Sequence, residues 1–122
     1  MTITGNFIGG KTVISSSNET MPVYDPATGK AVREVTVSTA QEVSEAIQVA
    51  RDAFDSWSRT TPLRRARVLF NFKMLLEQHV EELAGIIVSE HGKVWSDALG
   101  ELTRGMEVVE FAFEIPHLIK VE

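Results

Sequence analysis

The sequence contains no cysteine among its 122 residues. This absence excludes disulfide bonds, a thiolate nucleophile and thiolate metal ligands within these residues. The sequence also lacks the Gly-x-Ser-x-Gly motif that presents a nucleophilic serine in many hydrolases. No centre for nucleophilic acyl chemistry is available, and we predict no catalytic residue in the chain.

Long apolar runs and an excess of positive charge are also missing. The sequence contains no run of about 18 apolar residues, the length that a helix needs to cross a membrane. The N-terminus also lacks the basic and apolar regions of a secretory signal. The net charge of −5 and the pI of about 5.2 argue against a general nucleic-acid-binding protein. We therefore expect a cytoplasmic protein that binds neither membranes nor nucleic acids.

Cofactor motifs are absent from the sequence as well. No Gly-x-Gly-x-x-Gly motif follows a predicted strand, so no dinucleotide-binding site is visible. Residues 100–105 have the glycine spacing of a phosphate-binding loop, but Met106 and Glu107 stand where that loop needs lysine and serine or threonine. We predict no cofactor bound by these residues themselves.

Histidine is sparse, and its spacing does not suit a metal ion. His79, His91 and His117 lie far apart, and none has a second histidine at the spacing of metal ligands. His79 precedes Glu82 by three residues, which we interpret as an exposed pair on a helix. We predict no metal site.

The composition that is present suits one globular domain, with 43% hydrophobic and 24% charged residues. Residues 1–37 have the pattern of short strands joined by turns. Gly9 and Gly10 separate two short β-prone runs, as in a hairpin. A second turn is predicted from Asp25 to Gly29, with Pro26 early and the glycine late.

Residues after position 38 have the pattern of about four helices. Residues 39–42 form a capping box that opens a helix over about 40–57, and Thr61 followed by Pro62 opens the next one. A third helical segment is predicted over 79–91 and ends at Gly92. It is either separate from the second helix or continuous with it. Ser96 and Asp97 mark the start of a fourth helix, over about 96–115. On this last helix one face is apolar, formed by Leu99, Leu102, Met106, Val109 and Phe113.

These patterns predict an α+β fragment, with short N-terminal β-hairpins followed by about four α-helices and a predominance of helix. We expect a strand and hairpin segment over residues 1–37 and a helical layer over 38–122, which together form one truncated N-terminal domain. Pro116 disfavours helical geometry at Ile115, and we expect no further element before the chain stops at Glu122.

A cluster of arginines and one further arginine, Arg104, each have both a structural and a functional interpretation. A basic cluster, formed by Arg59, Arg64, Arg65 and Arg67, is either a solvated surface or a site for an anion or a partner chain. Arg104 either pairs with Glu101 or Glu107 on its helix, or binds a substrate carboxylate through its forked guanidinium group.

The order and spacing of several motifs resemble the N-terminal part of the aldehyde dehydrogenase superfamily. These motifs are NFIGGK, DPATGKAV, STAQEVSEAIQVARDAFDSW, TPLRRARVLFNFKMLLEQHVEELAGIIVSEHGK and DALGELTRGMEVVEFA. The segments RRARVLFNF and RGMEVVEFA, followed by IPHLIK, are more similar to one branch, the CoA-acylating methylmalonate-semialdehyde dehydrogenases. The sequence departs from this branch at Phe113 and Glu114, where small residues are expected, and at Val121, where glycine is usual.

The resemblance implies a complete protein about four times this length that oxidises a semialdehyde with NAD and passes the acyl group to CoA. Its nucleophilic cysteine and nicotinamide site would lie beyond Glu122. This chain alone is then expected to be inactive, with no cofactor of its own and with NAD and CoA used by the complete enzyme. In this branch a residue matching Arg104 is thought to bind the substrate carboxylate, so Arg104 is the one substrate-binding residue that the resemblance implies.

A second hypothesis assigns the chain to a different class, a stand-alone helical module that self-associates. The apolar residues between Leu63 and Leu76 cover most of the circumference of their helix. A chain of this size leaves such a helix partly uncovered, and exposed apolar area often marks an interface. We therefore expect a homo-oligomer, such as a dimer or a dimer formed by exchange of a helix.

Overall fold

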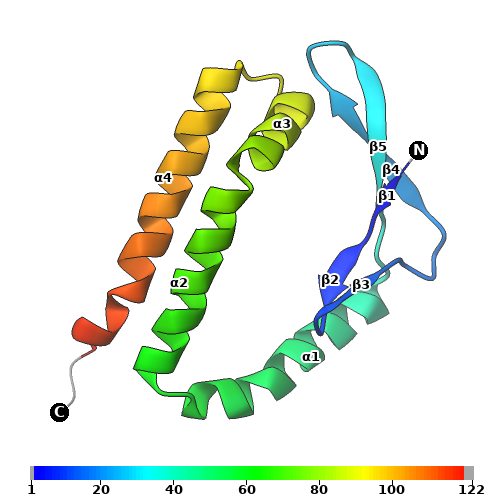
Figure 1. Ribbon diagram of the computed structural model, residues 1–122. Coiled ribbons are helices and arrows are strands. Elements are labelled where there is room, and N and C mark those ends of the chain that lie inside the picture. The colour runs from blue at the N-terminus through cyan, green and yellow to red at the C-terminus, as the bar shows by residue number, and fades with distance from the viewer. Residues whose placement is uncertain (1, 120–122) are drawn as a thin grey trace. The chain divides into compact units, whose positions relative to one another are not determined.

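The computed structural model describes residues 2–119, which form five short strands, four α-helices and one 3₁₀-helix (Figure 1). The strands are β1 (Ile3–Thr4), β2 (Asn6–Ile8), β3 (Lys11–Val13), β4 (Thr20–Asp25) and β5 (Lys30–Thr36). The helices are α1 (Ala40–Arg59), α2 (Pro62–Gln78), α3 (Val80–His91), α4 (Trp95–Phe113) and the 3₁₀-helix η1 (Ile115–His117). The predicted α+β fragment with a predominance of helix is therefore confirmed.

The chain divides into two compact units, Met1–Ser58 and Arg59–Glu122. The first unit contains the strands and nearly all of α1, and the second contains α2, α3, α4 and η1. Helix α1 thus groups with the strands that precede it rather than with the later helices. The expected organisation as one truncated domain stays a prediction.

Two hairpins shape the first unit, and both were predicted from their turns. Strands β2 and β3 pair in antiparallel fashion around Gly9 and Gly10, whose φ angles of 59° and 78° are those that glycine adopts without strain. Strands β4 and β5 pair around the second turn, where the amide of Gly29 donates to the carbonyl oxygen of Asp25 at 2.8 Å. Strand β1 adds to this sheet in parallel, which gives the order β1-β5-β4.

The capping box at the start of α1 is confirmed. The Glu42 amide donates to Thr39 Oγ1 at 3.2 Å, and the Thr39 amide donates back to Glu42 Oε2 at 2.9 Å. The same carboxylate accepts hydrogen bonds from Ser15 Oγ at 2.6 Å and from the Ser16 amide at 2.8 Å. The hydrogen bonds of Glu42 therefore connect the segment after β3 to the first turn of α1.

In the second unit α4 lies alongside α2 and α3 (Figure 1). Thr61 caps α2 by accepting from the Arg64 amide, and Pro62 is the first helical residue, as predicted. The second and third helical segments are separate and do not form one continuous helix. His79, with φ −110° and ψ 17°, lies between α2 and α3. Gly92 ends α3 with φ 74°, in the left-handed conformation expected of it.

The boundaries of α4 differ from the predicted range. The helix begins at Trp95 after Val94, which has an extended conformation and offers no side-chain cap, so Ser96 is not the capping residue. It ends at Phe113, and the chain then forms the 3₁₀-helix η1 around Pro116, although no further element was expected. A 3₁₀ turn accommodates this proline because its missing amide hydrogen falls at the start of the turn. Val121, the other departure from the branch pattern, lies outside the described residues.

The core of the described residues is small. Ala84 and Ala98 are its only wholly buried apolar residues, and no large side chain is fully buried within residues 2–119. The predicted inward face of α4 is confirmed as the packed one, since its five apolar residues are half-buried. Large apolar side chains remain exposed elsewhere, among them Ile47 and Phe54 on α1 and Leu63 and Leu75 on α2. Over the part of the chain that the structure describes, no helix is long and apolar enough to cross a membrane.

Substitution of Glu42 tests the fastening of the first unit. The four donors around its carboxylate, led by the Ser15 hydroxyl, lower the pKa of Glu42 from an ordinary value of 4.5 to about 2. The stabilisation is therefore complete above about pH 4.5 and is lost as the pH falls towards 2. We expect Glu42→Gln to lower the melting temperature at pH 7 and to approach the parent chain as the pH falls to 2, measured by circular dichroism.

Glu45→Gln is the matched control, because Glu45 is exposed on the same helix. A melting-temperature difference between Glu42→Gln and the parent that stayed constant from pH 7 to pH 2 would contradict this assignment.

Candidate functional site

Arg104, the predicted substrate-binding residue, lies near the middle of α4 and is exposed. Its Nη1 atom lies 3.5 Å from the position that a Cβ atom on Gly100 would occupy, so the guanidinium group lies back over the preceding turn of the helix. Nothing lies within 4 Å of the corresponding position on Gly105. The two glycines thus leave the surface around Arg104 without bulky side chains on these sides.

Arg104 does not pair with either neighbouring glutamate. Within the described range 2–119 no hydrogen bond or ion pair involves its side chain, although Glu101 and Glu107 stand three residues away on either side. Glu101 instead accepts a hydrogen bond from Lys93 Nζ at 2.5 Å. This contact lowers the pKa of the Glu101 carboxyl, chiefly through the Lys93 hydrogen bond and charge, with a smaller contribution from Arg104.

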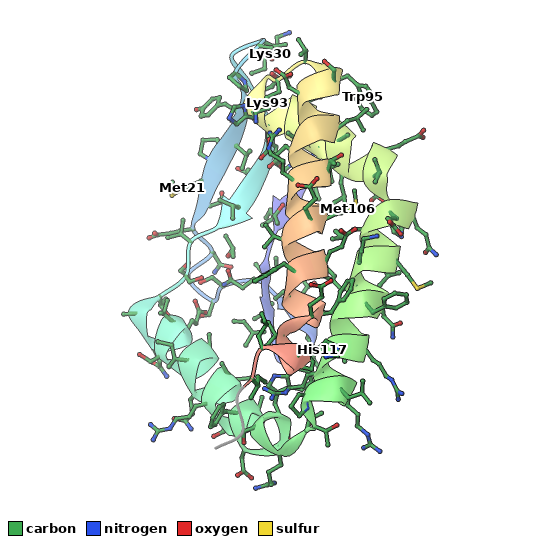
Figure 2. All side chains as sticks on the ribbon, turned by 90° about the vertical axis from the view of Figure 1, so that its left-hand side faces the viewer. Met21, Lys30, Lys93, Trp95, Met106 and His117 are labelled. Carbon is green, nitrogen blue, oxygen red and sulfur yellow. The ribbon has the colours of Figure 1, made fainter. Side chains whose placement is uncertain are left out.

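The Lys93–Glu101 pair spans the turn between α3 and α4. Figure 2 shows Lys93 at the end of α4 that carries Trp95, away from Met106 and His117. This pair could not be predicted from the sequence, because its members are eight residues apart and belong to different elements. No helical spacing rule relates such positions.

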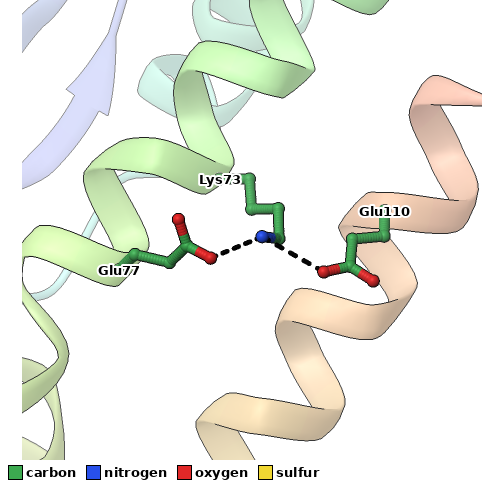
Figure 3. Close-up of polar contacts among 3 residues, drawn as sticks. All are labelled: Lys73, Glu77 and Glu110. Atoms are coloured by element: carbon green, nitrogen blue, oxygen red, sulfur yellow. Dashed lines mark hydrogen bonds and ion pairs between the residues drawn. The ribbon is translucent and has the colours of Figure 1, made fainter.

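A second lysine connects two helices of the same unit. Lys73 Nζ on α2 lies 2.5 Å from Glu77 Oε1 on the same helix and 3.1 Å from Glu110 Oε1 on α4 (Figure 3). These two carboxylates raise the pKa of Lys73. An edge-to-face contact between Phe70 and Phe113, with ring centroids 5.8 Å apart, lies between the same two helices.

The basic cluster at the start of α2 combines exposed and half-buried arginines, and its role as a solvated surface or as a site for an anion or a partner chain stays a prediction. Arg64 and Arg67 are exposed, and Arg65 is half-buried with an Nε atom that has no hydrogen-bond partner among the described residues. Arg59 is engaged in an interaction of its own. These contacts are compatible with both interpretations of the cluster, as a solvated surface or as a site for an anion or a partner chain.

The histidine predictions concern the second unit. His79 Nδ1 lies 2.9 Å from Glu82 Oε2, and both side chains are exposed, as expected for a surface pair. Among residues 2–119, no group of three or more His, Cys, Asp or Glu side chains could hold a metal ion.

The first unit contains an open apolar groove that the sequence analysis did not anticipate. It has a volume of about 420 Å³ and runs between β2 and α1. Its lining residues include Phe7, Ile8, Val43 and Ile47. Because it has few polar groups, this groove suits an apolar side chain rather than a charged substrate.

Comparison with protein families identifies the chain. The model of the aldehyde dehydrogenase family matches residues 13–122. The chain belongs to the aldehyde dehydrogenase family.

Individual relatives within the family agree with the branch suggested by the sequence. The chain is 46% identical over 121 residues to malonate-semialdehyde dehydrogenase 1 of Geobacillus kaustophilus, a match that covers 99% of this chain and 25% of the relative. It superposes with a TM-score of 0.95 on the methylmalonate-semialdehyde dehydrogenase of Oceanimonas doudoroffii, with 44% identity over 100% of this chain and 25% of that one.

A further solved structure is similar to the same extent. It is a protein from Sinorhizobium meliloti assigned as a methylmalonate-semialdehyde dehydrogenase and solved in complex with NAD. The TM-score is again 0.95, with 40% identity over 100% of this chain and 25% of that chain. This aldehyde dehydrogenase segment thus spans about a quarter of the length of the relatives it matches and corresponds to the N-terminal part of their fold.

The start of helix α1 in this aldehyde dehydrogenase segment does not fit a dinucleotide phosphate. The N-terminal amide groups of a helix are a common phosphate site, but at α1 they face Thr39 and the Glu42 carboxylate. A carboxylate in that position repels a phosphate instead of leaving the amides open to it. We derive no step of nicotinamide chemistry from these residues.

Substitution of Lys73 tests the connection between α2 and α4. We expect Lys73→Met, which keeps most of the aliphatic stem, to lower the melting temperature of the chain at pH 7. Because its pKa is raised above the ordinary 10.5, the stabilisation by Lys73 is present below that pH and is lost as the pH rises beyond it. Thermal unfolding followed by circular dichroism between pH 7 and pH 11 measures both effects.

Lys30→Met is the matched control, since Lys30 is exposed next to a turn of the first unit. A double-mutant cycle with Glu110→Gln isolates the interhelical part. Strict additivity of Lys73→Met and Glu110→Gln would contradict a direct contribution from that ion pair.

Proposed function

We propose that this chain forms the N-terminal part of an NAD-dependent, CoA-acylating dehydrogenase of malonate or methylmalonate semialdehyde. The observation that carries the proposal is the match over the whole chain to relatives of this one branch, at 40–46% identity. Because the chain spans about a quarter of these relatives, the activity is proposed for the complete protein. The chain alone is expected to be inactive, since it has no cysteine to attack the aldehyde.

Within this proposal Arg104 binds the carboxylate of the semialdehyde. The guanidinium group presents two parallel N–H donors to a carboxylate, a geometry that lysine does not offer. Arg104 is exposed, has no partner within residues 2–119 and lies beside two glycines, so its donors are available to a ligand. NAD would accept the hydride from the substrate in the complete protein, whereas Arg104 orients the acidic end of that substrate.

Replacement of Arg104 in the complete dehydrogenase tests this role. Hydrogen bonds to a charged group contribute about 1.5–3 kcal/mol, so we expect Arg104→Met to lower kcat/KM for malonate semialdehyde by about 10- to 100-fold. The value for propanal, which has no carboxylate, is expected to change little. Initial rates of NADH formation with both aldehydes measure the ratio.

Arg67→Met serves as the control, because it removes an equally exposed arginine from α2. Equal losses for the acidic and the neutral aldehyde in Arg104→Met would rule out carboxylate binding by Arg104.

A second candidate function, self-association of the chain itself, is supported by the exposed apolar side chains of α2. Leu63 is 60% exposed and Leu75 54%, on a helix that also packs against α4. Burial of such side chains against a second copy removes apolar area from water, which stabilises the dimer by about 25 cal/mol per Å² of buried apolar area. We propose a dimer, formed directly or by exchange of a helix.

Light scattering of the 122-residue chain over a dilution series tests this proposal. We expect the mass to rise above 13.5 kDa with concentration, and Leu75→Lys to shift the chain towards the monomer. Met21→Lys is the control, because Met21 is a similarly exposed apolar residue on β4. A constant mass of 13.5 kDa at every concentration would exclude the dimer.

A further inference from the structure

The side chains of Glu101 and Glu107 are both potential competitors for Arg104. Each is three positions from Arg104 on α4, a spacing at which glutamate and arginine commonly form an ion pair, and only Glu101 is within reach of Lys93 in the described contacts. Such an internal pair would occupy the guanidinium donors that a substrate carboxylate needs. Arg104 nevertheless makes no such pair within residues 2–119, and the position of Lys93 supplies a physical reason.

Lys93 follows the end of α3 and reaches across the turn to Glu101 Oε2 at 2.5 Å. The Lys93 side chain is 26% exposed and the Glu101 side chain 46%, so the contact lies at the surface but is partly shielded. Gly92 makes this reach possible, since its left-handed conformation turns the chain sharply between α3 and α4. The carboxylate of Glu101 is thereby held toward the start of α4.

We propose that Lys93 is a positioning residue, which engages Glu101 and so leaves the guanidinium group of Arg104 available for a substrate carboxylate. This inference rests on the proposed function, because it presupposes that Arg104 binds the acidic end of a semialdehyde. Lys93 itself does not touch the substrate. Its role is to remove an intramolecular acceptor that would compete with the substrate for the same donors.

Steady-state kinetics of the complete dehydrogenase test the inference with malonate semialdehyde and propanal as substrates. In Lys93→Met the freed Glu101 pairs with Arg104, and we expect KM for malonate semialdehyde to rise about two- to fivefold, as suits competition by a weak exposed pair. KM for propanal and kcat for both aldehydes are expected to stay near the parent values. Lys93→Arg keeps a cation opposite Glu101 and should behave like the parent.

The decisive variant is the double substitution Lys93→Met/Glu101→Gln. Removal of the competing charge should restore the parent KM for malonate semialdehyde, although Lys93 is still absent. A purely structural role of Lys93, such as interaction with the C-terminal end of α3, predicts no such rescue. Failure of the double variant to recover, or an equal rise of KM for propanal in Lys93→Met, overturns the inference.

Arg104→Met in the same experiment separates the two proposals. If it changes the preference for the acidic aldehyde while Lys93→Met does not, the carboxylate-binding role of Arg104 stands and the positioning role of Lys93 is wrong. If Arg104→Met leaves the preference unchanged, the role of Arg104 is wrong and the inference about Lys93 is overturned with it.

Discussion

The helices of this structure bury small side chains between them and leave most large apolar side chains partly or fully exposed, and this limits the apolar contacts that can hold the elements together. Ala84 and Ala98 are completely buried on α3 and α4, two helices that pack against each other. No large side chain is fully buried within residues 2–119. Few large apolar contacts are therefore available within the described residues, and caps, turns and charged contacts carry much of the local organisation.

Charged side chains connect elements where apolar contacts are few. Glu42 joins the segment after β3 to α1 in the first unit, and Lys73 joins α2 to α4 in the second. Lys93 and Glu101 connect the two sides of the turn between α3 and α4. Exposed pairs of this kind are individually weak, but they determine which cations and anions remain available. Lys93 engages Glu101, one of the two glutamates three positions from Arg104, and this contact links the scaffold to the function we propose.

Most of the local structure could be predicted, because its signals lie within a few residues of one another. Gly9 and Gly10 satisfy a hairpin that needs positive φ, Thr39 caps a helix through its hydroxyl group, and Gly92 ends one. The sequence left open whether the second and third helices break at His79, and it did not predict the start of α4 after Val94, since neither position has a capping side chain that marks it. The 3₁₀ turn at Pro116 was missed for a similar reason, as proline is compatible with both a turn and a stop.

The order of amino acids was sufficient to predict the succession of strands and helices and the likeness to aldehyde dehydrogenases, and it indicated Arg104 as a candidate substrate-binding residue. These conclusions depend on short-range spacing and on ordered motifs, which are visible along a chain. The three-dimensional fold was needed to show that Glu101 contacts Lys93 rather than Arg104, that Lys73 reaches Glu110 and that a groove opens between β2 and α1. Such contacts depend on where separate elements come together in space, and residue spacing contains no information about that placement.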